Sequence, residues 1–177
     1  MDANAGGVRW RYDVKQDGNQ SSFHGKPVLT ADLVVIGVDR GTDPQGQGHV
    51  YAFERATGKV RWKQLAAPGV SSAVLTDESL VIALVQTGEL IGFDIHSGQS
   101  IWKKQVTESG RDRYLPSPVL RNHVVYAGGY SGNLTAVNAQ TGDRVWQRNL
   151  EPGTHVQPVA VGDGVYAVTD SASTTWI

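Results

Sequence analysis

Hydrophobic positions along the chain gather in short runs that recur four times in the same order. Each recurrence opens with a proline or alanine and two apolar residues, at positions 27–29, 73–75, 118–120 and 158–160. An apolar segment follows a few residues later, at 33–36, 80–82, 124–126 and 165–167. Short apolar runs bounded by turn residues indicate β-strands, and no stretch keeps a helical period over the length of a helix. We therefore predict an all-β chain of repeated units, each with four antiparallel strands.

Tryptophans mark the repeat. Trp10, Trp62, Trp102 and Trp146 are spaced 52, 40 and 44 residues apart. Each lies four residues after a glycine, namely Gly6, Gly58, Gly98 or Gly142. Each also lies eight residues after a short polar or acidic residue, namely Asp2, Glu54, Asp94 or Asn138. Four-stranded units of about 40 residues are typical of the blades of a β-propeller.

This motif has a physical explanation within a blade. A glycine suits the tight turn between the third and fourth strands, where positive φ is needed, and the Asp or Asn before it accepts hydrogen bonds from backbone amides of the turn. The tryptophan then packs between neighbouring blades, with its indole N–H bonded to backbone. We therefore expect a structural role for the whole set: Trp10, Gly58, Trp62, Asp94, Gly98, Trp102, Asn138, Gly142 and Trp146.

The pattern A-x-D-x-x-T-G-x-x-x-W resembles the tryptophan-docking motif of PQQ-type propellers, and the resemblance covers essentially the whole chain. That family contains quinoprotein dehydrogenases and non-catalytic members such as BamB-like proteins and PQQ-repeat sensor domains. It implies a propeller, typically with eight blades, and an extracytoplasmic location (periplasm or cell surface). It does not imply one function, because the same blades serve enzymes, sensors and scaffolds.

We predict a single domain over residues 1–177, with blades at about 25–64, 69–104, 114–148 and 155–177, the last completed by residues 2–12. If Ile177 were followed directly by Asp2, the distance from Pro158 to Trp10 would be 28 positions, as from Pro118 to Trp146. Three arrangements remain open. Residues 2–12 complete the last blade of a second copy in an eight-bladed homodimer, or that of their own chain in a four-bladed ring, or the sequence is a piece of a longer chain. The resemblance favours the homodimer.

Charge and composition exclude several classes of function. Lys and Arg number 16 and Asp and Glu 17, giving a net charge of -1, so we expect no general electrostatic binding to nucleic acid. There is no cysteine, which excludes disulfides, Cys-ligated zinc and iron–sulfur clusters. No run of apolar residues has the length of a membrane span.

The sequence contains little that indicates a catalytic site. The five histidines are scattered without the spacing of a metal-ligand pair, and no nucleotide-binding or nucleophile fingerprint is present. The resemblance to quinoprotein dehydrogenases would imply PQQ with calcium, an adjacent-cysteine disulfide and a catalytic aspartate, which this sequence does not match. We expect no enzyme activity, no metal and no PQQ or other cofactor.

The long connecting segments, 11–26, 38–48 and 105–116, belong to two loop classes that share one face of a propeller. They carry cations and aromatic residues suited to a protein or peptide partner: Phe23, His24, Lys26, Arg40, Arg111, Arg113 and Tyr114. We predict a non-catalytic binding platform that uses this face. The alternatives are a binder of a small molecule or PQQ-type cofactor, and a structural propeller fragment without activity.

Overall fold

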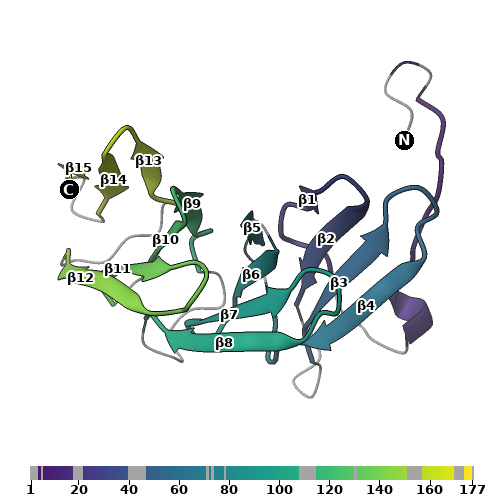
Figure 1. Cartoon of the computed structure of the whole chain (residues 1–177), viewed down its shortest axis with the longest axis horizontal. Helices are drawn as coiled ribbons and strands as arrows, with labels where there is room; N and C mark the ends of the chain where they lie inside the picture. The colour runs from purple at the N-terminus through teal and green to yellow at the C-terminus, as the bar shows by residue number, and fades with distance from the viewer. Residues whose placement is uncertain are drawn as a thin grey trace.

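The computed structural model describes residues 4, 6–17, 22–39, 47–70, 72, 74–77, 79–107, 115–129, 131–150, 157–169 and 174–176. It contains four antiparallel sheets that follow one another along the chain and form an open arc (Figure 1). The prediction of an all-β, blade-like architecture is confirmed. None of the described segments forms a helix of the length and apolar character that a membrane crossing requires.

Each sheet is built from consecutive strands. The first contains β1 (Val28–Leu29), β2 (Leu33–Val38), β3 (His49–Glu54) and β4 (Val60–Leu65). The second contains β5 (Leu75–Asp77), β6 (Leu80–Leu84), β7 (Glu89–Asp94) and β8 (Ser100–Gln105). The third contains β9 (Val119–Arg121), β10 (Val124–Gly128), β11 (Asn133–Asn138) and β12 (Arg144–Asn149). The fourth contains β13 (Val159–Val161), β14 (Gly164–Val168) and β15 (Thr174–Trp176).

The register repeats from blade to blade. In each of the first three sheets a tryptophan of the outer strand stands opposite a small residue of the third strand: Trp62 opposite Ala52, Trp102 opposite Gly92, and Trp146 opposite Ala136. In each of these three sheets, the strand register shifts between this small residue and the next residue of the third strand. The sequence repeat is therefore also a repeat of strand pairing, including its irregularity.

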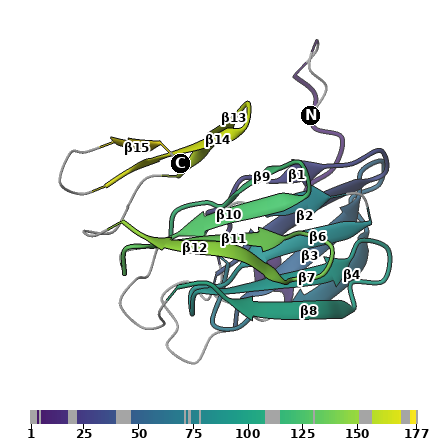
Figure 2. The same ribbon diagram turned by 60° about the vertical axis from the view of Figure 1, so that its left-hand side comes forward.

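The core lies between neighbouring sheets, which stack face to face (Figure 2). Val35 and Trp62 of the first blade pack with Val81 and Phe93 of the second in one buried cluster. The second and third blades share an equivalent cluster, with Ile82, Leu84 and Trp102 on one side and Val125 and Val137 on the other. Middle strands with both faces buried explain why β6 is apolar throughout rather than alternating.

The two ends of the chain lie at opposite ends of the arc (Figure 1). At the first blade, residues 6–13 and a short 3-10 helix, η1 (Val14–Asp17), cover the outer face of the sheet through Trp10, Tyr12 and Val14. At the other end, β15 pairs only with β14 among the described residues. Completion of the fourth blade by residues 2–12 stays a prediction, and residues 2, 3 and 5 lie outside the described part of the chain.

Candidate functional site

Three tryptophans hold consecutive parts of the scaffold together. Their indole nitrogens donate to backbone carbonyls: Trp10 to Arg55 at 2.9 Å, Trp62 to Ile95 at 2.8 Å, and Trp102 to Ala139 at 3.1 Å. Each indole lies on a glycine with positive φ, which is Gly58 at 73°, Gly98 at 73° and Gly142 at 75°. A Cβ atom on any of these glycines would lie within 2.7 Å of the indole. Glycine is therefore required at these positions for two reasons: the turn needs a positive φ, and the indole leaves no room for a side chain.

The turns themselves are held by a side chain at the end of the third strand. Asp94 Oδ1 accepts hydrogen bonds from the amides of Ser97 at 2.7 Å and His96 at 3.1 Å, and from the Ser97 hydroxyl at 2.7 Å. The bond from the Ser97 amide is the main cause that lowers the pKa of Asp94 below its ordinary value. Asn138 holds the equivalent turn of the third blade without a charge, accepting from Gln140 at 2.9 Å.

Trp146 is placed differently. Its ring contacts Tyr126 with centroids 5.8 Å apart, and it lies at the margin of a small apolar cluster with Leu134 and Val165. Its indole N–H donates to no atom within the described residues. Within the described residues, no glycine turn lies against Trp146 as Gly98 lies against Trp62 and Gly142 against Trp102.

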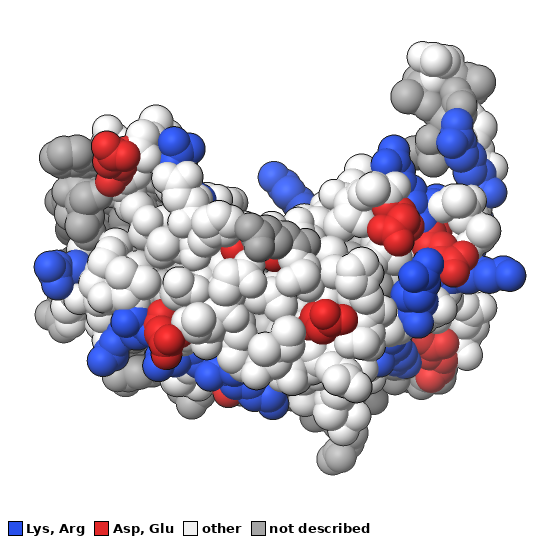
Figure 3. Space-filling view, viewed as in Figure 1, with Lys and Arg blue, Asp and Glu red and all other residues white. Residues whose placement is uncertain are grey.

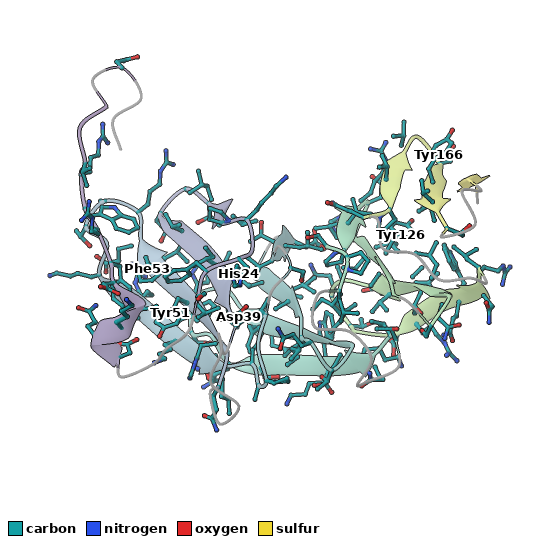
Figure 4. The ribbon with its side chains drawn as sticks, turned by 180° about the vertical axis from the view of Figure 1, so that it is seen from behind. His24, Asp39, Tyr51, Phe53, Tyr126 and Tyr166 are labelled. Carbon is teal, nitrogen blue, oxygen red and sulfur yellow. The ribbon has the colours of Figure 1, made fainter. Side chains whose placement is uncertain are left out.

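Part of the predicted loop face lies in the segment that leads into the first blade. His24 Nδ1 lies 2.5 Å from Asp39 Oδ2, and the Asp39 amide donates to the Ser22 carbonyl at 3.2 Å. Asp39 is 4% exposed, whereas the exposed Phe23, His24 and Lys26 face solvent. We name residues 22–26 with Asp39 the anchored corner; its paired side chains are labelled in Figure 4.

An aromatic layer supports the anchored corner. The rings of Phe23 and Tyr51 lie in an edge-to-face arrangement with centroids 6.4 Å apart. The rings of Tyr51 and Phe53 stack with centroids 5.5 Å apart, and both are labelled in Figure 4. Tyr12 also packs on Phe53, with ring centroids 4.7 Å apart. Aromatic contacts of this kind limit the movement of the layer, so Phe23 presents an apolar ring on a firm base.

The carboxylate of Asp17 links two tyrosines of this layer to a lysine. Asp17 Oδ2 accepts from the hydroxyls of Tyr51 at 2.5 Å and Tyr12 at 2.8 Å, and pairs with Lys63 Nζ at 3.2 Å. Burial acts to raise the pKa of Asp17, but these three hydrogen bonds outweigh it and lower the pKa. Burial raises the pKa of the Tyr12 hydroxyl. Nearby, burial and the charge of Lys63 lower the pKa of His49, whose buried Nδ1 has no hydrogen-bond partner among the described residues.

Charge is distributed unevenly although the net charge is small. The outer strands β4, β8 and β12 contain no acidic residue, and six basic ones: Arg61, Lys63, Lys103, Lys104, Arg144 and Arg148. Figure 3 shows basic groups along the lower edge of the molecule, and acidic groups lie beside basic ones at both ends of the view.

The predicted face is brought together only in part. Phe23, His24 and Lys26 share the anchored corner, whereas Arg40, Arg111, Arg113 and Tyr114 lie outside the described residues. Sequence reasoning missed Asp39, Tyr51 and Asp17. An acidic residue directly after a buried strand was the available signal for Asp39; nothing local to the sequence pairs Asp17 with Tyr51.

One cavity lies at the opposite end of β2 from the anchored corner. Its volume is about 520 Å³, and it is lined by charged and small residues: Arg9, Ala31, Asp32, Glu54, Arg55, Ala56 and Arg61. Arg61 is already paired with Glu54 at 3.5 Å. The sequence pattern had not indicated this site.

The repeated blades, their register and their tryptophan contacts agree with a known family. The family model described as outer membrane protein assembly factor BamB matches residues 1–176. The chain belongs to the BamB family. The BamB of Yersinia pestis is 23% identical over 189 residues, which cover 99% of this chain and 47% of that protein. The crystal structure of BamB from Moraxella catarrhalis superimposes with a TM-score of 0.70 at 25% identity, covering 88% of this chain and 46% of that one.

This BamB-family chain thus spans about half the length of the relatives it matches over nearly all of its own residues. A more distant relative is an enzyme: a quinohemoprotein alcohol dehydrogenase of Pseudomonas putida, 25% identical over 162 residues, or 22% of its length. The described residues of this chain hold no group of three His, Asp or Glu side chains close enough to bind a metal, and there is no cysteine. The absence of a calcium-assisted PQQ site stays a prediction.

Proposed function

We propose that the chain is a non-catalytic binding platform that recognises a protein or peptide through the loops on one face of the propeller. The observation that carries this proposal is the anchored corner. Phe23 is 37% exposed and rests on a buried aromatic layer, and Lys26 is exposed three residues further along the same segment. An apolar ring and a cation held on a rigid base are what a protein interface uses as anchors, because little conformational entropy is lost on binding.

The family supports a role for this platform outside the cytoplasm. Its members carry the name outer membrane protein assembly factor, and we extend that role to this chain: a scaffold in outer membrane protein assembly whose partner is another protein of that process. The working unit in this proposal is a homodimer. Because the chain spans about half of its relatives, the proposal concerns the four blades present here.

A second candidate is a small-molecule binder, and the cavity beside Arg9, Arg55 and Arg61 is the observation that favours it. Its lining combines these arginines with Asp32 and Glu54, which suits a small polar ligand. Native mass spectrometry of the purified chain tests this candidate, since a retained ligand adds mass that disappears on denaturation. An unchanged mass at every ligand concentration tried would remove it.

The binding proposal is tested by capture of proteins from an outer-membrane extract, quantified by mass spectrometry. Phe23→Ala and Lys26→Ala are expected to lower capture of the same partner by tenfold or more each, as about 1.4 kcal/mol of lost binding energy would. Matched controls are Val145→Ala, an apolar residue on β12 that is more exposed than Phe23, and Lys103→Ala, an exposed lysine on β8. Equal capture by all four variants would refute a binding role for this face.

A further inference from the structure

In the outer strands of the second and third blades, a bulge sends one aliphatic side chain out to solvent. The residues on either side of Ile101 in β8 pair with consecutive residues of β7, so Ile101 is the extra residue of the bulge. Val145 has the same position in β12. A bulge commonly redirects a side chain, and Ile101 and Val145 are each 55% exposed. Two aliphatic side chains therefore protrude at equivalent points of neighbouring blades.

Four cations lie on the same two strands. On β4, the outer strand of the first blade, the cations are neutralised: Arg61 pairs with Glu54 at 3.5 Å and Lys63 with Asp17 at 3.2 Å. Asp143, directly before β12, accepts a hydrogen bond from a hydroxyl of its own turn. Among the described residues, no carboxylate forms an ion pair with the four cations of β8 and β12: Lys103, Lys104, Arg144 and Arg148.

The protruding side chains and the cations form one surface on the outer side of the arc. β8 and β12 are the outermost strands of their sheets (Figure 1), and Figure 3 shows basic groups along the same lower edge. The sheet of β8 packs against a four-stranded sheet on each side, so the exposure of Ile101 is a property of its own strand. We name this surface the basic rim; it consists of Ile101, Lys103, Lys104, Arg144, Val145 and Arg148.

A bilayer surface fits the basic rim better than a polypeptide does. Anchors of protein interfaces fill pockets, whereas the cavity beside Arg9 is lined by the first blade and the segment before it, and by no residue of β8 or β12. Proteins that lie on membranes combine aliphatic side chains, which enter the headgroup boundary, with Lys and Arg, which attract anionic lipid. We propose that the basic rim binds the surface of a bilayer that contains anionic phospholipid, with Ile101 and Val145 entering the headgroup region.

This contact holds the blades edge-on to the bilayer, because the basic rim is formed by outer strands and not by connecting loops. The loops on the faces of the propeller then stay open to a protein partner. Lipid binding here is independent of the anchored corner, because no residue of the basic rim belongs to that corner.

Sedimentation of the 177-residue chain with lipid vesicles tests the proposal. Vesicles of phosphatidylcholine mixed with phosphatidylglycerol are expected to bind the chain, and vesicles of phosphatidylcholine alone are not. Binding should weaken as salt rises from about 0.1 M to about 1 M, because the screening length falls from about 10 Å to about 3 Å. Equal binding to both kinds of vesicle, or binding to neither at low salt, would overturn the proposal.

Paired substitutions test the charges of the rim. One cation near an anionic surface strengthens binding about fivefold, so Lys103→Gln together with Arg148→Gln should weaken it about 30-fold. Lys103→Arg together with Arg148→Lys keeps both charges and should bind as the parent chain does. The matched control is Lys15→Gln together with Lys59→Gln, two exposed lysines outside β8 and β12. If the control pair lost as much binding as the rim pair, net charge alone would explain the result and the assigned surface would be wrong.

Insertion of the aliphatic side chains has a separate readout. The chain contains no cysteine, so Ile101→Cys or the control Leu29→Cys can carry a single environment-sensitive fluorophore. Leu29 is 62% exposed but lies on β1, the inner strand of its sheet. Vesicle binding should shift the emission to shorter wavelength at position 101 and not at position 29. Equal shifts at the two positions, or none at position 101, would contradict insertion by the rim.

Poly-glutamate separates a bilayer from an acidic polypeptide as the occupant. It should compete weakly with vesicles, and its binding should not depend on Lys103 and Arg148. Tight binding of poly-glutamate with the same 30-fold loss in the rim pair would identify an acidic polypeptide and overturn the proposal, with about 30-fold again taken from two charges. Circular dichroism shows that each variant is folded.

Discussion

Removal of a docked indole should cost far more stability than removal of an undocked one. Trp102 is 9% exposed, its N–H is bonded to the Ala139 carbonyl, and its ring covers Gly142. Truncation of such a residue to alanine costs about 3–5 kcal/mol through lost burial and the cavity left behind. The Ala139 carbonyl loses its partner as well, which adds about 1 kcal/mol. We expect Trp102→Ala to lower the free energy of unfolding by about 4–6 kcal/mol, by addition of these terms.

Trp146 provides the internal comparison, because it has the same place in the repeat but is only partly buried and lacks an acceptor among the described residues. Trp146→Ala should cost about 1–2 kcal/mol, a typical effect of a partly buried site. The assay is urea unfolding followed by circular dichroism, at one low protein concentration because association would add stability. Equal losses for the two variants, or an unchanged midpoint for Trp102→Ala, would refute the assigned docking contacts.

Three other substitutions test the remaining contacts. Gly142→Ala should lower the melting temperature more than Gly162→Ala, because both glycines have positive φ but only Gly142 lies against an indole. Asp94→Ala should lower the free energy of unfolding by about 1 kcal/mol, as loss of a capping side chain does. Asp94→Asn should lower it by less. Because Asp94→Asn removes the carboxyl group, it should also remove part of the loss of stability that appears as pH falls below about 4. The pKa of His49 is lowered from 6.5, so its contribution to stability is present above that pH and lost as pH falls. His49→Gln should therefore flatten the pH dependence of the urea midpoint between about pH 6.5 and 5, and an unchanged slope would contradict the cause assigned to that pKa.

The blade architecture was predictable because its signals are local and repeated. The spacing of Trp62 and Trp102, with a glycine four residues before each, predicts both the turn and the partner surface of the neighbouring blade. These contacts depend on the repeat unit alone. A single sequence therefore carries enough information to predict an all-β propeller, which the four observed sheets confirm.

The anchored corner was predictable only as a loop with suitable residue types. Its geometry depends on Asp39 becoming buried at the end of β2 and on His24 returning to it from a separate segment. The contact of Asp17 with Tyr51 joins positions 34 residues apart. No periodicity or motif relates such positions, because their pairing is decided by how the N-terminal segment crosses the first sheet.

Site-directed photo-crosslinking tests the binding role most directly. A benzophenone amino acid is placed at position 23 in the anchored corner or, as the matched control, at position 145 on the exposed side of β12, and the chain is irradiated in an outer-membrane extract. The account predicts one dominant protein adduct from position 23, which disappears with Lys26→Ala, and none from position 145. Adducts of equal yield from both positions, or none from position 23, would contradict a binding platform at this face.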